Sequence, residues 1–372
     1  MFLSGQSPNF LDHTMFLFHA LSMWETFTTD TGLQASQVQT IQEKAIALKD
    51  SPLHLSLTHK AKTAIFNQDN ASLASLCKQG IASYGFLYPL VLLQAAFTSI
   101  LSLFENLALD EQIRRDTLSD ISIWVKVYEK HHQGETGLKQ VDWISKSCCA
   151  KVLRFGRLQY EKGPFMFPYS IYYDTLRQTY RIFANQGVFC DGKGFIVDEE
   201  RSSFTTSYLQ TPDFLIANEV NQTQGCIAEE PTKSYLASLV LLCEKDDIVV
   251  HMHIPEGEML TPLSVDNSLS QAKTYFSSCP LFVCASWLLD PELMQVSNPD
   301  GNICRFMQRF LKFPIAFDTP QLYERVFDFG CDKACVLSYE CTTSLQKQVQ
   351  KHLMQGGTFH TMGGFLPRPC KE

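Results

Sequence analysis

The chain has 372 residues, a length that predicts two domains or one large domain with an appendage. Hydrophobic residues make up 45% of it and charged residues only 19%, and the formal net charge is -8. That negative charge, with no basic stripe, excludes non-specific binding to nucleic acid or to an anionic membrane surface.

Neither of the two most apolar stretches predicts a membrane span. Residues 1–24 lack a basic start and are interrupted by Pro8 and Asp12, so they make a poor signal peptide. The longest apolar run, Phe86 to Phe97, contains Pro89 and is too short to cross a bilayer. We therefore expect a cytoplasmic protein.

The cysteines are numerous but scattered. There are 13, an odd number, and none forms a CxxC pair. Cys331 and Cys335 lie close in sequence, with Cys341 beyond, and a metal site that joins them to His251 or His253 is one interpretation. Buried free thiols in a reducing compartment are the interpretation we favour, so we predict no metal.

The first part of the chain has a helical pattern, from about Phe10 to Tyr128. It holds no clustered carboxylates, no nucleophile beside a base and no metal-ligand set. We therefore predict that residues 1–150 form an all-helical N-terminal domain. Its main predicted segments are Ser36–Leu48, His59–Phe66, Ala71–Tyr84, Leu87–Leu107 and Asp110–Tyr128.

The periodicity changes after Cys149, where Lys151 to Tyr160 alternates and is rich in β-formers. Two later stretches, Tyr180 to Val197 and Gln224 to Leu242, hold strand candidates separated by turns that are typical of antiparallel hairpins. Between them, Asp198 to Asn221 is polar and mixed, and we predict no regular structure there.

From residue 248 onward, strands alternate with helices. The predicted strands are Ile248–Ile254, Leu281–Leu288, Ala334–Tyr339 and a short return in residues 358–368. The predicted helices start at Thr261, run from Asn302 to Phe313, and span Ser344–Met354. We therefore predict an α+β chain in which residues 151–372 form a mixed sheet with packed helices.

One strand, loop and helix start combine into a candidate anion site. Thr261 suits the cap of a helix, Pro262 suits its first position, and the loop from Pro255 to Leu260 contains Gly257. Loop amides and the helix dipole converge at such a point, so a phosphate-bearing ligand is the functional interpretation. Ordinary packing of a helix on a strand is the alternative.

Four words stand out in the sequence: GRLQYE (Gly156–Glu161), HIPEGEMLT (His253–Thr261), SWLLDPEL (Ser286–Leu293) and TSLQKQVQKHLMQGG (Thr343–Gly357). In order and spacing they resemble a bacterial family of acyltransferases. That family joins a helical N-terminal domain to a C-terminal domain similar to the GNAT acyl-CoA N-acyltransferases. The resemblance covers roughly residues 35 to 365.

The resemblance implies a CoA site. In GNAT folds two parallel strands splay apart, the pantetheine arm lies in the gap, and the pyrophosphate rests on the loop and helix start that follow. It therefore implies acyl-CoA or acetyl-CoA as cosubstrate. The implied cofactor-binding residues are Ile254, Gly257, Met259, Leu260, Thr261, Asn302 and Arg305.

This sequence departs from the common GNAT pattern at two places. Glu256 and Glu258 flank the single glycine of the loop, which carries no Lys or Arg. Asn302 matches a pantetheine-binding Asn, but the Tyr that protonates the departing thiolate is missing. Arg305 or Arg309 is expected to face a phosphate instead.

Transfer of an acyl group to an amine needs a base, an oxyanion donor and a stabilised leaving thiolate. His253 stands at the end of its strand and is the first candidate base, because imidazole titrates near neutral pH. Glu256 is the rival base. Ser286 and Cys284 lie on one face of the second strand and are candidates to line the substrate cleft.

Two functions remain open from the sequence. The first is an acyl-CoA-dependent N-acyltransferase that acts on a small-molecule or peptide amine, without nucleic acid or membrane as partner. The alternative is a non-catalytic module that binds or senses acyl-CoA. The acidic loop and the missing Tyr permit the alternative, and the oligomeric state stays open.

Overall fold

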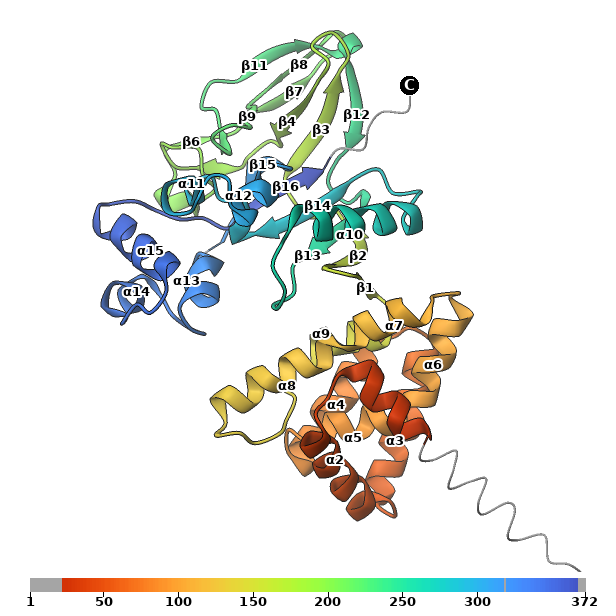
Figure 1. Ribbon diagram of the computed structural model, residues 1–372. Helices are drawn as coiled ribbons and strands as arrows, with labels where there is room; N and C mark the ends of the chain where they lie inside the picture. Colours follow the sequence, from red (N-terminus) through yellow and green to blue (C-terminus); the bar gives the residue numbers. More distant parts are fainter. Residues whose placement is uncertain (1–21, 318, 367–372) are drawn as a thin grey trace, which may run out of the picture. The chain divides into compact units, whose positions relative to one another are not determined.

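The computed structural model describes residues 22–317 and 319–366, and its chain divides into two compact units, residues 1–159 and 160–372 (Figure 1). The first unit is helical and the second is built on β-sheet. This arrangement confirms the predicted fold class. The predicted start of the helical pattern at Phe10, and the weak signal-like stretch around it, lie outside the described residues.

Helices make up most of the described part of the first unit. Residues 22–31 are helical. The helices that follow are α2 (Ala35–Leu48), α3 (Pro52–Phe66), α4 (Asn70–Tyr84), α5 (Tyr88–Ala95), α6 (Phe97–Asn106), α7 (Glu111–Leu118), α8 (Asp120–His131) and α9 (Val141–Cys148). The strand β1 (Val152–Phe155) ends this succession.

Two predicted helices of the first unit are each broken in two. The apolar stretch Leu87–Leu107 breaks at Ala96, which is buried and has φ -99° and ψ 6°, outside the helical region. The axes of α5 and α6 differ by 56° there. Among the described residues no single helix is long and apolar enough to cross a membrane, although this bent pair passes the test by length and composition. Asp110–Tyr128 likewise breaks at Ser119.

The helical unit is held by an aromatic core and one buried ion pair. Phe27 and Phe97 meet edge to face with ring centroids 5.2 Å apart. Asp30 is 1% exposed, and Nε of Arg114 donates to its carboxylate at 2.7 Å. A buried carboxylate is tolerated only with such a partner, so this pair is structural.

The second unit is organised by a mixed sheet with the strand order β2-β13-β14-β16-β15. Its strands are β2 (Leu158–Pro164), β13 (Ile248–His253), β14 (Phe282–Ser286), β15 (Leu311–Pro314) and β16 (Met362–Leu366). The central pair β13 and β14 is parallel, whereas β16 is antiparallel to β14 on one side and to β15 on the other. The prediction of a mixed sheet is therefore confirmed.

Smaller antiparallel sheets extend this unit. Two have three strands, in the orders β12-β3-β4 and β11-β8-β7. Their strands are β3 (Tyr169–Asp174), β4 (Thr179–Ala184), β7 (Tyr208–Gln210), β8 (Phe214–Ala217), β11 (Thr232–Tyr235) and β12 (Leu239–Cys243). Short pairs are formed by β5 (Phe189–Cys190) with β6 (Phe204–Thr205) and by β9 (Val220–Asn221) with β10 (Cys226–Ile227). Strands within Asp198–Asn221 correct the prediction of no regular structure there.

Helices of the second unit follow the central strands. They are α10 (Pro262–Tyr275), α11 (Leu293–Val296), α12 (Asn302–Met307), α13 (Gln321–Val326), α14 (Lys333–Ser338) and α15 (Ser344–Met354). Three-residue 3-10 turns are η1 (Glu199–Arg201), η2 (Leu236–Ser238) and η3 (Trp287–Leu289).

Two element predictions in this region were wrong. The predicted strand Ala334–Tyr339 is the helix α14, because Asp332 caps it by accepting from the backbone N–H of Cys335 at 2.8 Å. The helix predicted from Asn302 to Phe313 ends at Met307, and Leu311–Pro314 instead pairs with β16. In the first case the apolar residues suggested a strand where a capped helix forms. In the second case the long-range pairing with β16 made a strand of residues that the pattern assigned to a helix.

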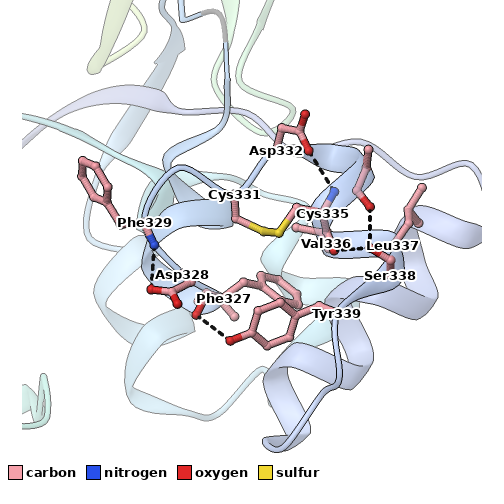
Figure 2. The surroundings of a disulfide bond; sticks show 12 residues. Phe327, Asp328, Phe329, Cys331, Asp332, Cys335, Val336, Leu337, Ser338 and Tyr339 are labelled. Atoms are coloured by element: carbon pink, nitrogen blue, oxygen red, sulfur yellow. Dashed lines mark hydrogen bonds between the residues drawn. A yellow bond between two sulfur atoms is a disulfide. The ribbon is translucent and has the colours of Figure 1, made fainter. Parts of the chain in front are cut away.

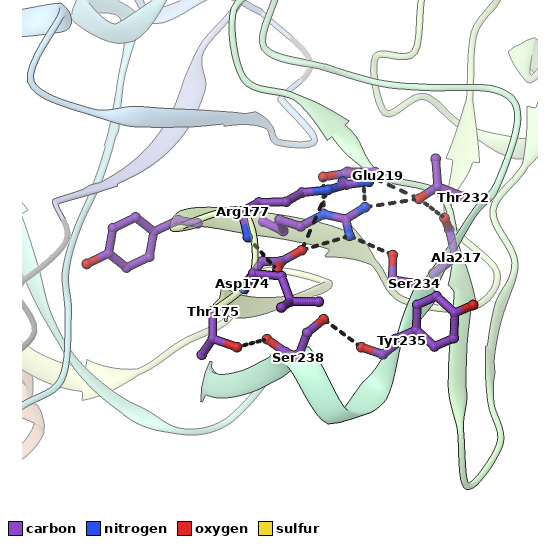
Figure 3. A network of polar contacts seen from close by, with 12 residues as sticks. Asp174, Thr175, Arg177, Ala217, Glu219, Thr232, Ser234, Tyr235 and Ser238 are labelled. Carbon is purple, nitrogen blue, oxygen red and sulfur yellow. Dashed lines mark hydrogen bonds and ion pairs between the residues drawn. The ribbon is translucent and has the colours of Figure 1, made fainter.

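A buried arginine fastens the small sheets to one another. Arg181 of β4 is 3% exposed, and its Nη1 donates to Ser234 Oγ at 2.6 Å and lies 3.5 Å from Asp174 Oδ2. It also forms an ion pair with Glu219. Figure 3 labels Asp174, Glu219 and Ser234 within this network of polar contacts. Because every group of this network has a partner, it supports the fold and does not expose a reactive charge.

Candidate functional site

The strand, loop and helix predicted as an anion site form as expected. β13 ends at His253, residues 254–261 have no regular structure, and α10 begins at Pro262. Thr261 is extended, with φ -66° and ψ 148°, and its Oγ1 accepts from Ser264 N at 3.2 Å. This side-chain cap fixes the point at which the loop becomes a helix.

The loop before α10 leaves its backbone amides available. Glu256, Gly257, Glu258 and Met259 are exposed, and Leu260 is buried. Within the described part of the chain, the N–H groups of Gly257, Glu258 and Met259 donate to no acceptor. Gly257 has φ 129°, which favours glycine, and a Cβ added there would meet nothing within 4 Å. The loop therefore offers donors and open space beside a helix start.

The two parallel strands stop pairing before they end. Their register joins Val250 to Phe282, His251 to Val283 and Met252 to Cys284, and no further pair follows. β13 continues to His253, while Ala285 and Ser286 of β14 pair only with β16 on the other side. The register of β13 with β14 therefore ends one residue before the end of β13 and two residues before the end of β14.

His253 has a carboxylate neighbour that we did not predict. Its Nε2 lies 3.5 Å from Oε2 of Glu161, which belongs to β2, the adjacent strand. The two side chains are 34% and 22% exposed. Glu161 ends the word GRLQYE, but only the pairing of strands 92 residues apart in sequence brings it to His253. His251, two residues earlier, lies with its Nε2 2.9 Å from the carbonyl oxygen of Pro164.

The other candidate catalytic residues lie differently. Glu256 is exposed in the loop. Ser286 is 7% exposed, and its Oγ accepts from the N–H of Leu288 at 3.1 Å, so it caps the turn η3. Cys284 is 1% exposed, and burial raises the pKa of its thiol to about 12, which keeps the thiol protonated.

The candidate residues beyond β14 gather around α12. Asn302 is the first residue of this helix and is half-buried, whereas Arg305 is exposed. Arg309 forms an ion pair with Asp266 of α10, and its Nη2 lies 3.5 Å from the carbonyl oxygen of Pro262. Arg309 thus reaches the first turn of α10, and with Lys273 it lines a pocket of about 390 Å³.

A second titratable pair follows β14. The carboxylate of Asp290, 1% exposed, accepts from the backbone N–H groups of Glu292 at 3.0 Å and His360 at 2.6 Å. Burial raises the pKa of Asp290 to about 7. Burial also lowers the pKa of His360 to about 4, and its ring stacks on Phe195 with centroids 3.7 Å apart. Sequence reasoning had no signal for this pair beyond the Asp290-Pro291 word.

The prediction of free thiols was wrong at one place. Cys331 and Cys335 form a disulfide, as Figure 2 shows, across the start of α14. Cys331 precedes the capping residue Asp332 and Cys335 lies in the first turn of α14, and their Cα atoms are 5.4 Å apart, within the range that a disulfide spans. The cysteines that stay free in the described residues are mostly buried. No three His, Cys, Asp or Glu side chains of the described residues form a metal-binding group.

Both units match known protein families. A family profile described as an N-acyltransferase N-terminal domain matches residues 24–149, and one described as a GNAT-like C-terminal domain matches residues 152–366. No curated protein sequence matches the chain.

Solved structures share the fold. An acyltransferase in complex with decanoyl-CoA and teicoplanin is 16% identical with a TM-score of 0.57, over 92% of this chain and 86% of that chain. A mutant acyltransferase in complex with octanoyl-CoA is 16% identical with a TM-score of 0.56, over 94% and 88%. At this identity the likeness shows the fold alone. The chain belongs to the acyltransferase family that joins an N-acyltransferase N-terminal domain to a GNAT-like C-terminal domain.

Proposed function

We propose that the protein transfers an acyl group from a CoA thioester to the amine of a small molecule or peptide by direct attack. The observation that carries the proposal is the set of exposed loop amides beside the point where β13 and β14 stop pairing. The solved acyltransferases of the same fold, whose complexes contain decanoyl-CoA, octanoyl-CoA and teicoplanin, support it.

The diphosphate of CoA would rest on the amides of Gly257, Glu258 and Met259 and on the start of α10 after Thr261. Ile254 and Leu260 would border the pantetheine arm, and Asn302 would contact it from α12. The carboxylates of Glu256 and Glu258 are exposed, so they can extend into water while their N–H groups face the ligand. Arg305 is exposed, and Arg309 is the arginine nearer to the start of α10.

The chemistry needs one base. The acceptor enters as an ammonium ion and gives a proton to His253, the free amine attacks the thioester carbon, the C–S bond breaks, and the CoA sulfur takes the second amine proton. Main-chain N–H groups near the point where β13 and β14 stop pairing would stabilise the oxyanion. Glu256 remains the rival base, and its side chain is exposed.

Binding and turnover separate this function from its alternative. Acetyl-, octanoyl- and decanoyl-CoA are added to the full chain while melting temperature is recorded, and thiol release is followed with an aminosugar, a free amino-terminal peptide and a lysine peptide. A thermal shift with thiol release supports the transferase. A thermal shift without release supports a binding or sensing module, and no shift defeats both.

We also propose a cytoplasmic location, the compartment in which CoA thioesters are made. The disulfide between Cys331 and Cys335 opposes this placement, because disulfides are rare in reducing compartments. Rapid alkylation of thiols in lysed cells, followed by mass analysis, decides the point. Alkylated Cys331 and Cys335 support a reducing compartment, and a protected pair contradicts it.

A further inference from the structure

A carboxylate faces the proposed base from the next strand. The sheet order places β2 directly beside β13, and the residues of a strand alternate between its two faces. Tyr160 points to α10, where its hydroxyl lies 2.9 Å from Ser268 Oγ, so Glu161 points to the opposite face. There its Oε2 lies 3.5 Å from His253 Nε2.

A second contact fixes the same alignment of the two strands. Gly163 is two residues beyond Glu161 on that face, and a Cβ placed on it would lie 3.4 Å from the ring of His251. The ring of His251 also contacts the carbonyl of Pro164. The step from His251 to His253 along β13 thus matches the step from Gly163 back to Glu161 along β2. His253 is therefore held opposite Glu161.

We propose that Glu161 is the positioning residue for His253, an inference that rests on the proposed function. With the proton of the neutral ring on Nε2, 3.5 Å from the carboxylate, Nδ1 of His253 would be free to accept the proton of the acceptor amine. The imidazolium that forms is then stabilised by the neighbouring negative charge. No bond to carbon forms at Glu161, and its carboxylate stays ionised throughout.

The charges around His253 make this contribution separable. His251 lies on the same strand, and Glu256 and Glu258 follow in the loop. The neighbouring strand β14, Phe282–Ser286, carries no charged side chain. Glu161 is thus the carboxylate of the adjacent strand that contacts the ring, and its removal changes one charge at a known distance.

The test is an NMR titration of the histidine ring protons in the full chain, with the His253 signal assigned by its loss in His253→Gln. In Glu161→Gln we expect the titration midpoint of His253 to lie at lower pH than in the parent chain, because the neighbouring negative charge is gone. In Glu161→Asp, which keeps the charge on a shorter arm, the fall is smaller. Glu244→Gln removes an exposed carboxylate beyond the other end of β13 and leaves the midpoint unchanged.

With any amine that supports thiol release, kcat/KM of Glu161→Gln is expected to fall about tenfold, while KM for acyl-CoA stays unchanged. The acid limb of the pH profile of kcat/KM should move to lower pH. A midpoint that is equal in the parent chain and Glu161→Gln overturns the proposal. If Glu161→Gln does not fold, an unchanged midpoint in Glu161→Asp overturns it. Full turnover in His253→Ala instead defeats the base, and so the proposed mechanism, whatever the titration shows.

Discussion

Two pairs of titratable side chains lie near the carboxyl ends of the parallel strands β13 and β14, and their carboxylates differ in access to water. His253 at the end of β13 and Glu161 beside it keep 34% and 22% of their side-chain surface exposed. Asp290, after β14, is 1% exposed and backbone amides hold its carboxylate, whereas His360, just before β16, is half-buried. Burial raises the pKa of Asp290 and lowers that of His360.

This difference shows that a shifted pKa does not by itself identify a catalytic residue. Asp290 ties the turn after β14 to the segment that enters β16, so its shift follows from burial in a structural joint. A base must exchange its proton with an incoming amine and therefore needs access. The pair of His253 and Glu161, which keeps part of its surface exposed beside the loop amides, is the one that meets this need.

The largest effect is expected on turnover. His253→Ala removes the proposed base, so thiol release with an active amine should fall by about a factor of 1,000, within the range of general-base contributions. The thermal shift caused by CoA should remain, because the loop amides do not depend on this side chain. Unchanged turnover would reject His253 and favour Glu256.

The pair of Asp290 and His360 is tested through the pH dependence of the free energy of unfolding. Asp290 has a raised folded pKa, so its stabilising contribution is present below pH 4 and is lost as pH rises to 7. His360 has a lowered folded pKa, so its contribution is present above pH 6.5 and is lost as pH falls to 4. Each is on the order of 3 to 4 kcal/mol at 1.36 kcal/mol per pH unit, and the two slopes oppose each other.

Single substitutions should therefore unmask opposite slopes. Relative to the parent chain, the free energy of unfolding of Asp290→Asn should rise between pH 4 and 7, and that of His360→Gln should fall. Urea unfolding at several pH values measures both. Parallel curves for the parent chain and Asp290→Asn would show that the buried carboxyl does not titrate in this window.

A smaller effect is expected from the disulfide. Closing the short loop between Cys331 and Cys335 stabilises the fold by about 2 kcal/mol in the chain-entropy account. Reduction with a dithiol should lower the melting temperature by the amount that corresponds to this loss of stability. In the variant with both cysteines replaced by Ser, the dithiol should leave the melting temperature unchanged. The CoA-induced thermal shift should persist in both, since α14 lies outside the proposed site.

The smallest effect is expected at the loop glycine. Gly257→Ala strains a backbone with φ 129° and places a methyl group in the space proposed for the diphosphate, so Kd for CoA should rise about tenfold. Gly187→Ala is a matched control, because Gly187 also has a positive φ of 86° and open space around it. Equal CoA affinity in both variants would count against the placement.

Sequence pattern was sufficient where the deciding contacts are local. The cap at Thr261, the proline at Pro262 and the buried face of α10 follow from residues within a few turns of one another. The exposed loop before them follows too. The roles proposed for the loop residues, for Asn302 and for Arg305 stay predictions.

Pattern failed where distant segments decide the outcome. Leu311–Pro314 is a strand because β16 lies beside it, and Glu161 reaches His253 because β2 lies beside β13. Ser286 looked like a cleft residue, but its hydroxyl is used by the turn that follows it. Burial of Asp290, and with it the shifted pKa, likewise depends on the fold around it and cannot be read from neighbouring residues.

The central claim is that a diphosphate-bearing thioester docks on the amides before Pro262, and an amide NMR titration tests it most directly. Coenzyme A is added to the ¹⁵N-labelled chain, with pantetheine, which lacks the diphosphate, as the comparison. The account predicts saturable shifts of the Gly257, Glu258 and Met259 amides with coenzyme A and much smaller ones with pantetheine. Saturable binding that leaves these three amides unmoved would contradict it.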